Sequence, residues 1–168
     1  MKSLTAGALL LLPFAAAAVA QPAPQRTTAT YEDWTVQCEQ HPGPPPQKLC
    51  EMVQTVQSQG QTVSRVALGH ATKAEPFKIV VQLPVNLFLP AGIRIQADDK
   101  DPGLALTFKR CVPAGCFADV DIKDDTIKRL RAASANWKIT FKNSGQQDAA
   151  VPLSFKGFNQ AFDVLLKE

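Results

Sequence analysis

The strongest candidates for chemistry in this chain are its four cysteines, Cys38, Cys50, Cys111 and Cys116. In a protein that leaves the cytoplasm, as the N-terminus described below indicates, an even number of cysteines predicts disulfides, and four allow three pairings. Proximity along the chain favours Cys38–Cys50 and Cys111–Cys116. The spacings fit neither the close cysteine pairs of a zinc site nor the Cys-x-x-Cys of redox proteins. We therefore predict structural disulfides; the alternative is a periplasmic thiol-disulfide redox protein that uses Cys111 and Cys116.

The two histidines, His41 and His70, are not accompanied by a recognisable catalytic motif. The sequence contains no GxSxG, HExxH, Walker or dinucleotide-binding pattern. His41 stands in a proline-rich turn and His70 at the end of a predicted strand, where solvated or structural roles are typical. The acidic run of residues 98–101 lacks the layout of a calcium loop and is typical of a turn. The sequence therefore predicts no catalytic residues, no metal site and no cofactor.

A short apolar segment is the candidate for contact with a partner. Pro84 and Pro90 bracket it, so an irregular connection is predicted there rather than a regular strand. Its large apolar side chains are Val85, Leu87, Phe88 and Leu89. An exposed apolar loop marks a contact site, whereas a buried one would form a lid over one end of the core. The sequence permits both interpretations.

The composition describes a globular, weakly basic domain. The chain has 168 residues, of which 45% are hydrophobic and 20% charged, and this excludes a disordered chain. The formal net charge of +3 is too small to indicate nucleic acid as the main partner. The basic stretch of residues 123–131 contains its own aspartates and no interleaved aromatic residues, as a solvated helix face does. The expected partner is a protein or another envelope component, not a nucleic acid.

The N-terminus has the three parts of a secretory signal peptide. Lys2 supplies the positive charge, residues 4–14 form a short apolar core, and residues 18–20 (Ala-Val-Ala) provide a cleavage site. The apolar run is near the lower length limit for spanning a bilayer and contains Pro13, which favours cleavage over a retained anchor. We expect a signal peptide over residues 1–20 and no transmembrane segment after its removal. The predicted location is the periplasm, with association with the outer membrane or secretion as further destinations.

The remaining chain is predicted to be a single β domain. Residues 21–30 contain little to bury and are expected to form a flexible lead-in. Period-two alternation of apolar residues predicts strands near residues 34–38, 66–70, 77–83, 93–97, 104–109, 117–122, 137–141 and 151–155. Asp124 and Asp125 are predicted to cap one short helix, and Asn159 a second. The expected fold over residues 31–168 is mainly β, an antiparallel β-sandwich-like domain with one or two short helices.

Several motifs, taken in order, resemble those of a known family. The first is Tyr31-x-Asp33-Trp34-x-Val36-x-Cys38, followed by Cys50. The later ones are Leu87-Phe88-Leu89-Pro90-Ala91-Gly92-Ile93, Arg110-Cys111-x-Pro113-x-Gly115-Cys116, Val151-Pro152-Leu153-Ser154-Phe155-Lys156-Gly157-Phe158 and Ala161-Phe162. Together they resemble the invasion-associated locus B family of Gram-negative bacteria over nearly the whole mature chain.

The resemblance implies a small, exported, β-rich protein of the periplasm or the outer membrane. It also implies the pairing of the first two cysteines and of the last two. Some pathogenic members of the family are linked to entry into host cells, whereas no enzymatic activity is implied. The function expected from the sequence is thus that of a non-enzymatic binding or envelope-interaction protein.

Overall fold

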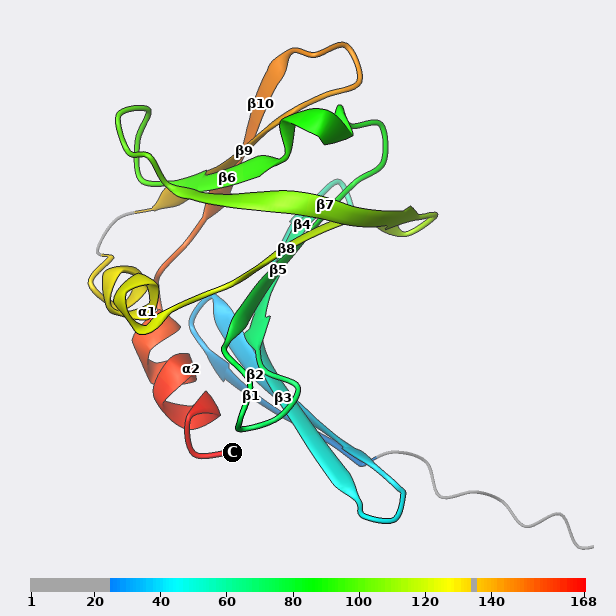
Figure 1. The fold of residues 1–168 in the computed structure, drawn as a ribbon, viewed down its shortest axis with the longest axis vertical. Helices are drawn as coiled ribbons and strands as arrows, with labels where there is room; N and C mark the ends of the chain where they lie inside the picture. Colours follow the sequence, from blue (N-terminus) through cyan, green and yellow to red (C-terminus); the bar gives the residue numbers. More distant parts are fainter. Residues whose placement is uncertain (1–24, 134–135) are drawn as a thin grey trace, which may run out of the picture.

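The computed structural model describes residues 25–133 and 136–168, so the signal peptide expected over residues 1–20 lies outside the described residues. Within these residues, ten strands, two α-helices and one 3-10 helix follow one another (Figure 1). The strands are β1 (Gln25–Tyr31), β2 (Trp34–His41), β3 (Gln47–Ser58), β4 (Gln61–Gly69), β5 (Lys78–Leu83), β6 (Ile93–Gln96), β7 (Leu104–Val112), β8 (Gly115–Asp121), β9 (Trp137–Lys142) and β10 (Asp148–Leu153). The helices are η1 (Leu89–Ala91), α1 (Asp124–Arg131) and α2 (Phe158–Leu165).

All ten strands belong to one continuous antiparallel sheet. Its order is β1-β2-β3-β4-β5-β8-β7-β6-β9-β10. The sheet is strongly bent, so that β6, β7, β9 and β10 lie across the upper end of β1–β5 (Figure 1). The inner faces of the two parts share one core, as the two sheets of a sandwich do. The prediction of a mainly β, antiparallel fold with two short helices is confirmed.

The core lies between the two parts of the sheet and against α2. Its largest fully buried side chains come from β2–β6, β9 and α2, and include Trp34, Phe162, Met52, Leu68, Leu83, Ile95 and Ile139. Helix α2 contacts β1, β2 and β3 and buries its apolar side. We call the face of the sheet that carries this core the inner face. The opposite face of β1–β5 and β8 carries the groove that forms the candidate site.

Trp34 and Gln54 hold the segment that follows β10 against the inner face. The indole Nε1 of Trp34, whose side chain is 1% exposed, donates to the carbonyl of Ser154 at 2.9 Å. The amide of Gln54 donates to the same carbonyl at 2.8 Å and accepts from the Ser154 N–H at 2.9 Å. These bonds satisfy buried polar groups that would otherwise destabilise the core. They join residues 100 and 120 positions apart in the sequence.

Two strands differ from the expectation. Gln25–Tyr31 form β1 along β2, so most of the lead-in expected over residues 21–30 is a strand. Its side chains are almost all exposed, so the strand leaves no apolar period in the sequence. β3 was not predicted because Met52, Val53 and Gln54 are buried in succession. Burial on both faces of a strand removes the alternation that marks one.

The two helix starts also differ from the expectation. The prediction that Asp124 and Asp125 cap α1 is wrong: the N-cap is Lys123, and the aspartates occupy the first turn. There they interact favourably with the N-terminal end of the helix dipole. Asn159 does not cap α2 but lies inside it, and its Nδ2 donates to the carbonyl of Arg131 at 3.0 Å. Side-chain types at a helix start therefore gave the position of each helix but not its cap.

Candidate functional site

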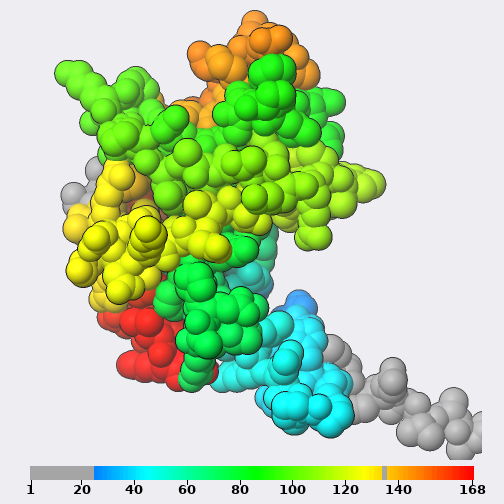
Figure 2. Space-filling view, in the orientation of Figure 1, coloured from blue at the N-terminus to red at the C-terminus, as the bar shows by residue number. Residues whose placement is uncertain are grey.

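A groove of about 540 Å³ lies on the face of β1–β5 and β8 that is opposite the inner face. The strands form its floor, the connection between β4 and β5 forms one wall, and the β2–β3 hairpin contributes the other. In Figure 2 the two walls lie side by side in the lower half of the molecule, the β4–β5 connection in green and the hairpin in cyan. No other cavity described for residues 25–133 and 136–168 is as large.

The floor of the groove is apolar. Strand register places Ala67 of β4 beside Val80 of β5, and both line the groove with Leu49 of β3. Ala67 is 4% exposed, whereas Leu49 is 37% exposed. A large exposed aliphatic side chain on an apolar floor is typical of a binding surface.

Ion pairs on three strand pairs surround this floor. Arg26 of β1 bonds to Glu39 of β2 at 2.9 Å, and Lys78 of β5 lies 3.4 Å from Asp121 of β8. Both pairs are cross-strand neighbours in the ladder. A third pair forms where Glu51 of β3 accepts from Arg65 at 2.7 Å and from Gln37 at 2.5 Å. The rim is thus polar and hydrogen-bonded, and it alternates in charge.

His41 and His70, the two histidines considered in the sequence, both line this groove. The His70 Nδ1 lies 2.7 Å from the carbonyl oxygen of Thr72, inside the β4–β5 connection. Its ring meets the ring of Phe77 edge-on, with centroids 4.7 Å apart. His70 therefore shapes one wall of the groove.

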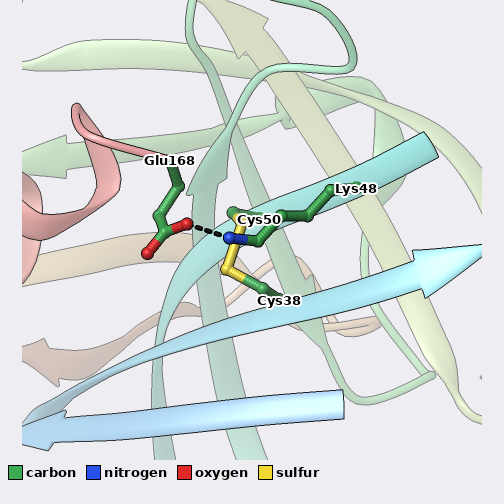
Figure 3. Close-up of a disulfide and its surroundings, with 4 residues drawn as sticks. All are labelled: Cys38, Lys48, Cys50 and Glu168. Atoms are coloured by element: carbon green, nitrogen blue, oxygen red, sulfur yellow. Dashed lines mark hydrogen bonds and ion pairs between the residues drawn. A yellow bond between two sulfur atoms is a disulfide. The ribbon is translucent and has the colours of Figure 1, made fainter. Parts of the chain in front are cut away.

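The structure contains both disulfides that sequence proximity favours. Cys38 and Cys50 are direct cross-strand partners on β2 and β3 and lie on the inner face. Beside them Lys48 forms an ion pair with Glu168 at the end of the chain, which lies next to the disulfide (Figure 3). Glu168 and the two sulfurs lie close enough together to resemble a ligand set, but sulfur atoms joined in a disulfide are not the thiolates that bind metals.

The second disulfide, Cys111–Cys116, closes the hairpin between β7 and β8. Its two cysteines are also direct cross-strand partners, one exposed and one buried. Among the described residues no cysteine is free. Both disulfides therefore link strands that are already adjacent in the sheet.

The predicted contact segment lies at the other end of the molecule from the groove, around η1 (Figure 1). Val85 and Leu89 are 45% and 41% exposed. Leu87 packs against the core and pairs with Asn143, and the N–H of Phe88 donates to the carbonyl of Lys142 at 2.9 Å. The segment is thus partly a lid over the core and partly an exposed apolar surface. Its role in partner contact stays a prediction.

Asp101, in the acidic run between β6 and β7, has a structural role. Its carboxylate accepts from the backbone N–H groups of Ala97 and Gly103, both at 2.8 Å, and from Arg129 of α1. These backbone hydrogen bonds, followed by that of Arg129, hold the pKa of Asp101 below its ordinary value. The Asp101 side chain is 10% exposed. The carboxylate fastens the β6–β7 turn to α1.

We expect Asp101→Asn to lower the free energy of unfolding at pH 7 by roughly 1–3 kcal/mol, since hydrogen bonds to a charged group are lost. Because the folded-state pKa is depressed, this stability is present above the unfolded-state pKa of about 4 and disappears as the pH falls below it. Urea unfolding between pH 3 and pH 7 measures both effects. Asp99→Asn is the control, because that side chain is 87% exposed and pairs only with Lys138. Equal losses in both variants would contradict the assignment.

The groove is the feature that the sequence did not predict. Its lining residues come from six strands and one connection, and each is an ordinary sheet or turn residue in the sequence. The only available signal was the run of polar residues that alternate with the core residues of β2, which are Thr35, Gln37 and Glu39. That pattern is also what a plain solvated face produces.

No helix among the residues described is both long enough and apolar enough to cross a membrane.

Comparisons of the sequence and of the fold with known proteins point to the same group of proteins. Residues 34–166 match the family described as Invasion associated locus B (IalB) protein. The invasion protein B homologs of two Brucella abortus strains, 2308 and biovar 1 strain 9-941, are each 33% identical to this chain over 136 residues. The aligned part covers 80% of this chain and 76% of theirs. The crystal structure of invasion associated protein B from Bartonella henselae superposes with a TM-score of 0.70 at 21% identity, covering 84% of this chain and 96% of that one.

Proposed function

This chain belongs to the invasion associated locus B protein family, and from that premise we propose that it is an exported binding protein and not an enzyme. Its relatives are named as invasion proteins, which supports an invasion-associated identity. The signal-peptide pattern of residues 1–20 and the two disulfides support export to the periplasm or beyond, where disulfides persist. Cleavage at the expected site would leave Gln21 as the first residue.

The groove on β1–β5 and β8 is the proposed binding site, and its ligand is a polypeptide segment of an envelope or host-surface protein. The observation that carries this proposal is the combination of an apolar floor with a rim of alternating charges. A polypeptide offers apolar side chains for such a floor and backbone and charged groups for such a rim. Among the described residues, the lining of the groove includes no serine, threonine or free cysteine, which disfavours acyl transfer through a hydroxyl or thiol nucleophile there.

Photocrosslinking in intact cells tests the site. A photoreactive residue in place of Leu49, on the groove floor, is expected to form one discrete adduct with a protein of the envelope or host surface. The same residue in place of Val112, on the β7–β8 hairpin, is the matched control, because the two positions are 37% and 40% exposed. The groove is expected to yield the adduct and the hairpin is not.

Affinity for the captured protein then tests the chemistry of the floor. Leu49→Lys is expected to weaken binding by at least about tenfold, because an ammonium group would be desolvated against apolar side chains. Titration calorimetry with the purified full chain measures the change, and Val112→Lys is expected to leave the affinity unaltered. Adducts of equal yield at both positions, or a Leu49→Lys affinity within twofold of the original, would refute the proposal.

A further inference from the structure

The two edges of the sheet are built differently. β10, at one edge, carries Pro152, which has no N–H to offer a further strand, and Asp148, whose side chain is 88% exposed. β1, at the other edge, has seven residues without proline, lysine or glycine, and it pairs with β2 without a bulge from Gln25 to Tyr31. Proline, bulges and charged side chains, above all lysine, are the devices that normally prevent edge strands from pairing. β1 has no proline, lysine or bulge, and its one charged side chain, Arg26, is paired with Glu39 of its own subunit.

Among residues 25–133 and 136–168, no strand pairs with the outer edge of β1. Six of its seven residues are exposed, and within the described residues its ladder partner is β2 alone. The start of α2 lies close to the last residue of β1, since Gly157 lies against the carbonyl of Tyr31.

We infer that β1 pairs antiparallel with β1 of a second copy of this chain, forming a two-fold symmetric dimer with one continuous sheet. A symmetric contact requires the same strand to be complementary to itself when reversed. A pairing centred on Thr28 places Thr28 opposite its own copy, Arg26 opposite Thr30, and Thr27 opposite Ala29. All these opposing residues except Arg26 are small, and Thr–Thr neighbours are favourable cross-strand pairs.

The charge distribution of β1 also fits this occupant. Arg26 is its only charged residue and is paired with Glu39 within its own subunit. In the proposed register the two copies of Arg26 are offset by four residues, about 13 Å along the strands. That exceeds the screening length of roughly 8 Å at physiological ionic strength, so their repulsion is weak. Arg26 also lines the groove. In the dimer the two grooves would therefore lie next to each other on the same face of the continuous sheet, one on each side of the symmetry axis.

Charged substitutions of Thr28, the residue on the symmetry axis, test whether β1 forms the dimer contact and whether the proposed register is correct. Sedimentation equilibrium of the full chain is expected to show a monomer–dimer equilibrium. Thr28→Lys and Thr28→Glu each place like charges face to face, roughly 5 Å apart, and each is expected to weaken dimerisation by at least tenfold. An equimolar mixture of the two variants is expected to recover dimers, because lysine then faces glutamate.

The control is Thr107→Lys, at an exposed threonine of β7 inside the same sheet, and it is expected to dimerise as the original chain does. Circular dichroism confirms that each variant is folded. A chain that stays monomeric up to millimolar concentration overturns the inference. So do a Thr28→Lys variant that dimerises normally and a mixture that does not recover dimers. Pairing of β1 with a strand of another protein would give that monomeric result.

Discussion

Trp34→Ala is expected to lower the free energy of unfolding by about 3–5 kcal/mol, the range typical of removing a buried tryptophan. The side chain is 1% exposed and its ring meets that of Phe158 edge-on at 5.2 Å between centroids. The substitution opens a cavity and leaves the Ser154 carbonyl with Gln54 as its remaining side-chain donor. Urea unfolding followed by far-ultraviolet circular dichroism, with the disulfides intact, measures the loss.

Two further variants separate the contributions of the ring and the hydrogen bond. Trp34→Phe keeps much of the ring volume but lacks the indole N–H, so an intermediate loss is expected. Leu166→Ala removes an aliphatic side chain from a residue that is 54% exposed and is expected to change stability by less than about 0.5 kcal/mol. A loss below about 1 kcal/mol for Trp34→Ala would show that this junction does not hold the fold together.

Gly157→Ala is the second large effect, with an expected loss of roughly 2–5 kcal/mol in the free energy of unfolding. Gly157 precedes α2 with a φ of 76°, a conformation that side chains rarely adopt. A Cβ there would lie 1.9 Å from the carbonyl oxygen of Tyr31. Both groups belong to the backbone, so relief requires α2 to move away from the β1–β2 turn. Thermal unfolding and urea unfolding report the cost.

Gly60→Ala is a close control for this substitution. Gly60, in the β3–β4 turn, has a φ of 77°, but a Cβ there meets no atom within 4 Å. The two variants therefore share the backbone strain, and their difference measures the contact with Tyr31. We expect Gly60→Ala to cost only about 1–2 kcal/mol. If the two variants lose the same stability, the close approach of α2 to β1 is not what Gly157 provides.

Trp34 and Gly157 belong to one junction, between the start of β2 and the segment that leads from β10 into α2. Trp34 begins β2, whereas Ser154, Gly157 and Phe158 lie in the link from β10 to α2 and at its start. The first and last groups of motifs that resemble the family meet here in space. Their function is therefore architectural, because they fasten α2 over the inner face of β1–β3. Residues that characterise the family in this region need not belong to a binding site.

Sequence reasoning succeeded where the determining interactions are local. Alternation along β5 and β9 identifies strands because one face of each is buried. The two disulfides join cysteines separated by 12 and 5 positions, which are brought together by a single hairpin each. The candidate contact segment of Val85–Leu89 was placed correctly as an irregular connection, because two prolines restrict it.

The amino-acid sequence by itself determined the β character of this domain, its two local disulfides and its family, since these depend on residues near one another or on ordered motifs. Only the tertiary structure decided how the sheet bends, which polar residues surround the groove and which strands form the edges. The physical reason is register. The groove extends from Arg26 on β1 to Asp121 on β8, and five successive strand pairings separate these two strands. The sequence of a single strand does not specify which strands it pairs with or in which register.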